Sequence, residues 1–280
     1  GLTSTPDGDE TLTVNPASSA IFDASGNAAA TSQSNNTIKL KDLAIPIITG
    51  LVLSADNAAV TVAFSENVFN ATGGSGAMEV SDFVFSISGG VAGLSSATPT
   101  SITGSGSGSG RNYALGIGLN AAPSGAETLT VNPAASDVIY DSQDNVAATS
   151  QNNNTVALND KVAATITGVA LAADNSTIAV TFSESVFNTN GGSGALEASD
   201  FVFSISGGVA TLSAATPTSI SVSGNVYTLG IGLSGTPSGD ETLTVTLAEA
   251  AVFDAKANVS SMSQSNNTVK LNDKGPPTIT

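Results

Sequence analysis

Acidic side chains recur at matching places along this chain, so their chemistry is the first that can be predicted. Two sets of four stand out: Asp42, Glu66, Asp82 and Asp141, then Asp160, Glu184, Asp200 and Asp254. Four carboxylates gathered at one site repel one another strongly unless a cation joins them. Oxygen-only ligands suit a hard ion with six to eight contacts, so each set is a candidate Ca²⁺ site if the fold brings its members together.

Composition excludes several other kinds of site. The chain has no His and no Cys, which removes zinc thiolate sites, Cys nucleophiles and the commonest general base. It carries 23 acidic and 7 basic residues, a formal net charge of −16, which argues against a nucleic-acid partner. No apolar run is long enough to span a membrane, so we expect no membrane insertion in this segment.

The chain is a tandem array of one repeat. The segment DFVFSISGGVA occurs at residues 82–92 and again, letter for letter, at residues 200–210. A second segment, ETLTV, starts at Glu10, Glu127 and Glu241. We therefore expect four parts: residues 1–42 as the last third of one repeat, 43–160 and 161–273 as complete repeats, and 274–280 as the start of another, with Ile279–Thr280 opening it. Because residue 1 falls inside a repeat, we expect the chain to be part of something longer.

Each complete repeat is predicted to be all-β. Apolar residues alternate with period 2, as in Val60, Val62 and Phe64, and Gly, Pro, Asn and Asp clusters separate the runs. The second complete repeat yields seven strands, expected at residues 166–171, 177–182, 200–205, 210–214, 226–231, 241–245 and 267–271. Seven short antiparallel strands in about 100 residues predict an immunoglobulin-like β-sandwich, with the repeats arranged end to end. The Gly104–Gly110 insert, GSGSGSG, is expected to be a flexible hairpin loop.

Strand direction predicts where the acids lie. Successive antiparallel strands place Glu184, Asp200 and Asp254 at one end of the sandwich, and the preceding linker brings Asp160 there. The same reasoning gathers Asp42, Glu66, Asp82 and Asp141 in the first complete repeat. The alternative is that these acids cap turns and solvate loops, since Asp and Asn bond their own backbone there.

Two of these motifs resemble those of a known family. The segment FSESVF at residues 182–187 and the FDASGN loop at residues 22–27 are similar to motifs of the bacterial immunoglobulin-like repeats of S-layer proteins and giant surface adhesins. The arrangement is also similar to cadherin-like tandem domains, in which acids of the linker and of the domain end share calcium. The resemblance implies an extracellular, bacterial, repetitive stalk, on the cell surface or secreted.

Three functions are compatible with these observations. The first is a non-enzymatic structural or adhesive repeat of a long surface protein or filament, whose partners are neighbouring repeats or other copies of itself. In a variant of it, neighbours complete the partial repeat by strand exchange. The second is a carbohydrate-binding module array of a secreted enzyme, although its Phe residues fall in strand patterns typical of a core. The third is an enzyme with Glu66 and Asp82 as a glycosidase-like pair, but a pair that recurs in each repeat fits ion binding better.

Overall fold

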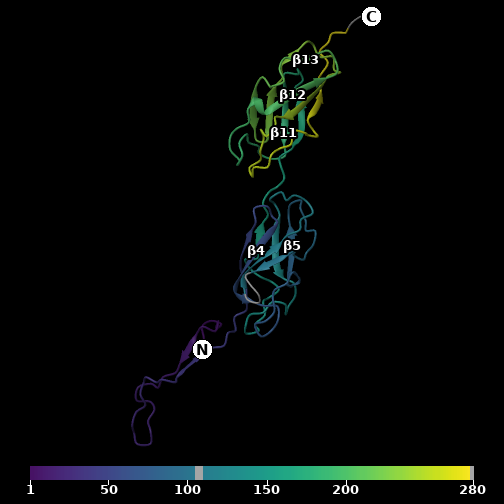
Figure 1. The fold of residues 1–280 in the computed structure, drawn as a ribbon. Helices are drawn as coiled ribbons and strands as arrows, with labels where there is room; N and C mark the ends of the chain where they lie inside the picture. The colour runs from purple at the N-terminus through teal and green to yellow at the C-terminus, as the bar shows by residue number, and fades with distance from the viewer. Residues whose placement is uncertain (105–109, 278–280) are drawn as a thin grey trace. The chain divides into compact units, whose positions relative to one another are not determined.

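The computed structural model describes residues 1–104 and 110–277, and it divides into two compact units, Gly1–Asn159 and Asp160–Thr280. Antiparallel strands dominate both units, and the only helices among the described residues are two single 3-10 turns (Figure 1). None of the described helices is long and apolar enough to cross a membrane. The predicted all-β fold class is therefore confirmed.

Unit 2 is a sandwich of two sheets. One sheet has the order β10-β11-β15-β14, and the other has the order β12-β17-β18. These are the A-B-E-D and C-F-G orders of an immunoglobulin-type sandwich. The strands are β10 (Ile166–Leu171), β11 (Thr177–Phe182), β12 (Phe201–Ser206), β14 (Ile220–Ser223), β15 (Val226–Gly230), β17 (Thr242–Leu247) and β18 (Thr268–Lys270), with a small pair β13 (Thr211–Leu212) and β16 (Leu233–Ser234).

Unit 1 contains the same sandwich, ordered β3-β4-β7-β6 and β5-β8-β9. Its strands are β3 (Ile48–Leu53), β4 (Ala59–Val68), β5 (Phe83–Ser88), β6 (Ile102–Gly104), β7 (Gly110–Gly116), β8 (Thr128–Pro133) and β9 (Thr155–Ala157). The predicted loop insert Gly104–Gly110 falls between β6 and β7, which pair with each other, and its residues 105–109 lie outside the described residues. Ile279 and Thr280 lie outside them as well.

Period-2 alternation explains which side chains form the core. Along β11, TIAVTF, every second residue is buried and the others are half-buried. Burying one such aliphatic or aromatic side chain contributes roughly 1.5–3 kcal/mol. The six Phe residues predicted to be core are all buried: Phe64, Phe83, Phe85, Phe182, Phe201 and Phe203. In each unit one Tyr ring packs against two of these Phe rings. The ring centroids of Phe182 and Tyr227 are 5.6 Å apart, and the two rings meet edge to face.

Residues 1–42 differ from both sandwiches. They contain only one hairpin, β1 (Thr11–Thr13) paired with β2 (Thr37–Lys39), drawn purple in Figure 1. Its register joins Leu12 to Ile38, as β8 joins Leu129 to Val156. No described strand pairs with the other edge of β1.

The sequence pattern located most strands and missed two kinds of feature. Strands β10 and β11 begin and end where they were predicted, and five further predicted strands overlap observed ones. The strands β14 and β16 were not predicted, because runs of four and two residues are too short for their alternation to stand out. The 3-10 turns η1 (Val80–Asp82) and η2 (Ala198–Asp200) were also not predicted.

Candidate metal centre

Three carboxylates of unit 2 meet at one end of its sandwich. Asp160 opens the unit, Glu184 follows the end of β11, and Asp254 lies in the turn after the β17 strand. One oxygen from each of the three lies within 4.8 Å of the others. Asp254 is fully buried, and the other two are half-buried. Strands β11 and β17 both run towards this end of the sandwich, so Glu184 and Asp254, which follow them, lie together there, as expected.

The Asp254 carboxylate is fixed by its own loop. Its Oδ1 atom accepts hydrogen bonds from Lys256 N at 2.7 Å and from Asn258 N at 2.8 Å. Its Oδ2 atom accepts one from Asn258 Nδ2 at 2.7 Å. The same Nδ2 atom donates to the carbonyl oxygen of Asp160 at 3.3 Å, so Asn258 joins the loop to the start of the unit. Because a carboxylate oxygen has two lone pairs, Oδ2 keeps one for a further ligand.

Unit 1 builds the same group from Asp42, Glu66 and Asp141. Their oxygens also lie within 4.8 Å of one another, and Asp141 is again fully buried. Asp141 accepts from Gln143 N, Asn145 N and Asn145 Nδ2, and Asn145 Nδ2 donates to Asp42 O at 3.3 Å. The two units thus repeat the arrangement bond for bond.

The glutamate of each group carries the electrostatic strain. Burial, followed by the nearby charges of Asp141 and Asp42, raises the pKa of Glu66 to about 7, although Arg111 opposes the shift. The pKa of Glu184 is also raised, first by burial and then by the negative charges of Asp254 and Asp160. Asn225 occupies the position in unit 2 that Arg111 has in unit 1. A bound cation would remove this repulsion in both units.

Asp82 and Asp200 do not belong to these groups. Each ends a 3-10 turn and caps it: Asp82 Oδ2 accepts from Glu79 N at 2.7 Å, and Asp200 Oδ2 accepts from Glu197 N at 2.7 Å. Burial, partly offset by this hydrogen bond, raises the pKa of Asp82. The strand directions indicated the correct end of the sandwich, but a local cap keeps each aspartate from joining the other three acids.

A pair of buried carboxylates was missed as a structural feature. Glu127 and Glu241 are fully buried, and each caps the Gly-Gly turn of its unit. Glu241 accepts from Val209 N, Ala210 N, Ser238 N and Gly239 N at 2.8 to 3.2 Å. These hydrogen bonds, from Ala210 first, lower the pKa of Glu241 to about 2. Burial alone would raise the pKa of Glu127, but the hydrogen bonds from the Ala92, Ser124 and Val91 amides outweigh this effect and lower the pKa to about 2.

The signal for this feature was present in the sequence. A Gly-Gly pair lies near the end of each copy of the repeated segment DFVFSISGGVA, at residues 82–92 and 200–210, and a glutamate opens each later ETLTV segment. Gly208 has a φ of +57°, and a Cβ atom there would lie 2.2 Å from the Glu241 carboxyl carbon. The turn therefore has to be glycine for the carboxylate to reach its backbone donors.

The donor set of each acid group fits a hard cation. Three carboxylates and no nitrogen or sulfur ligand are what Ca²⁺ or Mg²⁺ prefers. Turn chemistry is present at the same time. In residues 1–42, Asp23 accepts hydrogen bonds from Ser25 N, Asn27 N and Asn27 Nδ2 at 2.8 to 2.9 Å. Among the described residues, Asp23 belongs to no three-carboxylate group. The aspartate loop therefore forms without any neighbouring acid. It becomes a possible ion site only where a linker aspartate and a glutamate add their carboxylates to it.

Comparison with known proteins assigns no family. No protein-family model and no curated protein sequence matches this chain. Among solved structures, the chain is similar to the N-terminal part of the bacterial S-layer protein SbsC, with 14% sequence identity and a TM-score of 0.29. The alignment covers 81% of this chain and 44% of that one, so it spans less than half of the S-layer chain. A similarity at this TM-score carries no argument about function.

Proposed function

We propose that this chain is a non-enzymatic structural repeat of a long extracellular bacterial surface protein. We also propose that the acid group of each unit binds a hard cation, with Ca²⁺ as the first candidate. One observation carries the proposal. Two units repeat the same sandwich, the same buried aspartate and the same three-carboxylate group. Duplication of a whole unit extends a structure and supplies no distinct second activity.

The position of the acid group gives the cation a mechanical role. Asp160 is the first residue of unit 2, whereas Glu184 and Asp254 belong to the body of its sandwich. An ion that contacts all three would fasten the entering chain to the sandwich. Asn258 already bridges Asp254 and Asp160 O by a 3.3 Å hydrogen bond, which is long and therefore weak. Cation binding would stabilise this attachment against local unfolding.

The residue types also favour a non-catalytic role. The chain has neither His nor Cys, and the six strand Phe residues that a sugar platform would need on the surface are buried. Low charge content, at 11%, and abundant Ser, Thr, Asn and Gly suit an exposed extracellular surface. The extracellular location is part of this proposal.

Calorimetric titration of the full chain with Ca²⁺ tests it. We expect one ion per acid group, with Glu66→Gln removing one binding event and Glu184→Gln removing the other. Glu249→Gln is the matched control, because it removes the same charge from an exposed position outside both groups. Absence of binding to the unchanged chain, or binding that both group variants retain, would contradict the cation part of the proposal.

A further inference from the structure

The hairpin of residues 1–42 exposes the residues that form the core elsewhere in the chain. Leu12 is 47% exposed, Val14 63% and Ile21 57%. Their counterparts in unit 1, Leu129, Val131 and Ile139, are each 0% exposed. Those of unit 2, Leu243, Val245 and Val252, are 0 to 1% exposed. Residues 1–42 thus present one part of a sandwich core without the strands that cover it in the complete units.

In the complete units a neighbouring strand pairs with the strand that carries these residues. Strand β8 pairs with β5, where Leu129 faces Ile87 and Val131 faces Phe85. Strand β17 pairs with β12 in the same way, joining Leu243 to Ile205 and Val245 to Phe203. The free edge of β1 therefore has a defined complement, a strand of the FVFSIS type.

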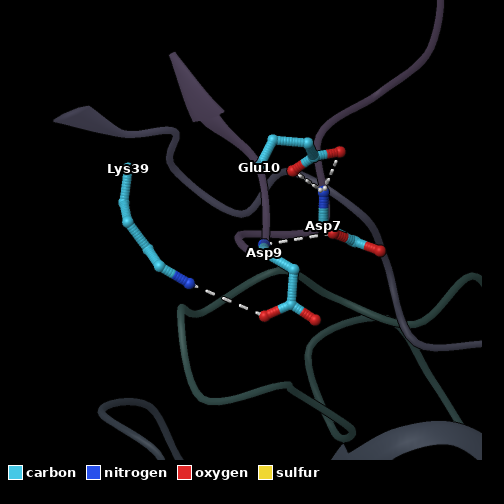
Figure 2. Close-up of polar contacts among 4 residues, drawn as sticks. All are labelled: Asp7, Asp9, Glu10 and Lys39. Carbon is cyan, nitrogen blue, oxygen red and sulfur yellow. Dashed lines mark hydrogen bonds and ion pairs between the residues drawn. The ribbon is translucent and has the colours of Figure 1, made fainter. Parts of the chain in front are cut away.

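A polar group on the same hairpin also lacks part of its complement. Figure 2 shows Glu10, the counterpart of Glu127 and Glu241, with its carboxylate accepting from Asp7 N at 3.1 Å and 3.4 Å. Asp7 stands where Ser124 and Ser238 stand in the complete units, so this local half of the cap is formed. The other half is supplied elsewhere by the Gly-Gly turn, through Val91 N and Ala92 N or through Val209 N and Ala210 N. Within residues 1–104 and 110–277, no such turn reaches Glu10.

A second polar group shows the same pattern. Gln33 donates from Nε2 to Ala30 O at 2.6 Å, as Gln151 and Gln264 do to their own loops. In the complete units the Oε1 atom of this glutamine also accepts from the first strand, from Ile48 N at 2.9 Å and from Ile166 N at 2.8 Å. The described residues provide no such donor for Gln33. Apolar surface, Glu10 and Gln33 therefore all require the same missing strands.

We propose that residues 1–42 are an acceptor surface for a polypeptide segment that supplies the strands equivalent to β10–β15. The occupant is a segment of this repeat type, with an FVFSIS strand followed by a Gly-Gly turn. The inference rests on the repeat architecture of the proposed function and does not depend on cation binding.

A second copy of the chain in this form does not meet the requirement. Its strands β3–β7 and β10–β15 already pair with their own β8 and β17 partners. The occupant therefore has to bring strands that are not engaged in a complete unit. We expect the 280-residue chain to remain monomeric across concentrations in analytical ultracentrifugation, and self-association through residues 1–42 would overturn this choice of occupant.

A fusion to the full chain tests the surface directly. By alignment Gly1 corresponds to Gly232 and to Gly118, so a copy of residues 161–231 placed before Gly1 would complete the repeat. Hydrogen–deuterium exchange of residues 10–14 is measured in EDTA, with and without the fused segment. We expect the fusion to slow their exchange by about 100-fold or more, towards the rate of residues 127–131. A parallel fusion uses a copy of residues 43–117.

Substitution within the fusion separates specific docking from general crowding. Glu10→Gln and Leu12→Asp should each return residues 10–14 towards the fast rate in the fusion, and they should leave that rate unchanged in the unfused chain. If residues 10–14 exchange at the unfused rate in both fusions, the proposal is overturned. The experiment contains no cation, so its failure would leave the calorimetric test of ion binding unaffected, and the reverse also holds.

Discussion

Residues 10–42 and residues 127–160 have closely related sequences, but only the second segment is covered. Both form the same hairpin register, the same aspartate–asparagine loop and the same asparagine clamp, in which Asn36 Nδ2 donates to Val14 O and Asn154 Nδ2 donates to Val131 O, each at 2.9 Å. These local bonds form in both segments. Burial of the apolar face and the second half of the glutamate cap depend on strands from the other part of the repeat.

The largest difference is expected in the apolar residues. Leu129→Ala should destabilise unit 1 by about 2–5 kcal/mol, because it leaves a cavity in a packed core. Leu12→Ala should change stability by about 0.5 kcal/mol or less, because Leu12 already contacts solvent. Urea unfolding of the full chain, followed at unit 1 by hydrogen exchange, measures both. Equal effects of the two substitutions would contradict the comparison.

The glutamate pair should give the next largest difference. Glu127→Gln removes the charge that several backbone amides bind, and bonds to a charged group contribute about 1.5–3 kcal/mol each. We therefore expect a loss of about 3 kcal/mol in unit 1. Glu10→Gln should have little effect, since Glu10 keeps only its local donor. The same unfolding experiment reports on both, and a large loss from Glu10→Gln would show that its cap is complete without a partner.

Two pH windows should separate the buried glutamate from the acid group. The folded pKa of Glu127 is about 2, below its ordinary value of 4.5, so its contribution is present above pH 4.5 and is lost as the pH falls towards 2. The folded pKa of Glu66 is about 7, above its ordinary value, so in EDTA unit 1 should lose stability as the pH rises from 4.5 through 7.

Thermal unfolding at pH 3, 5 and 8 checks both windows. Glu66→Gln should abolish the loss between pH 5 and 8 and leave the loss between pH 5 and 3 unchanged. A loss at alkaline pH that persists in this variant would show that Glu66 is not its source.

The smallest difference concerns the asparagine clamp. Asn154→Ala should destabilise unit 1 by about 1 kcal/mol, because the Val131 carbonyl and the Asn132 side chain lose a buried partner. Asn36→Ala removes equivalent bonds at an open edge, where water replaces them, and should cost less. Hydrogen exchange of β9 and β2 compares the two, and a larger effect at β2 would contradict the account.

The sequence predicted what alternation and strand direction determine. Alternating apolar residues located β10 and β11 and identified the buried Phe residues, because side chains of a strand point to opposite faces. Strand direction also brought Asp160, Glu184 and Asp254 to one end. Strand direction also placed Asp82 and Asp200 in the acid groups, and this was wrong. A 3-10 turn directs their carboxylates towards Glu79 N and Glu197 N instead.

The burial of Glu127 and Glu241 could not be obtained from periodicity. Both lie just before a strand, where a charged residue ordinarily faces solvent. Their burial depends on the Gly-Gly turn that follows the neighbouring strand of the same sheet, β5 or β12, a tertiary contact between segments separated by more than 30 residues. Strand β14 was missed for a related reason, since its four residues are too few to identify alone and its pairing with β15 defines it.

The most direct test of the cation-bound repeat is calorimetric melting of the full chain at pH 7.5 with excess Ca²⁺ and with EDTA. Ligand at about 100 times its Kd stabilises a folded unit by about 2.7 kcal/mol, so we expect both units to melt higher by roughly 5 °C or more in Ca²⁺. The double variant Glu66→Gln, Glu184→Gln should lose this shift, and Glu249→Gln should keep it. Melting that is the same in Ca²⁺ and EDTA would show that the two acid groups act only through their loops.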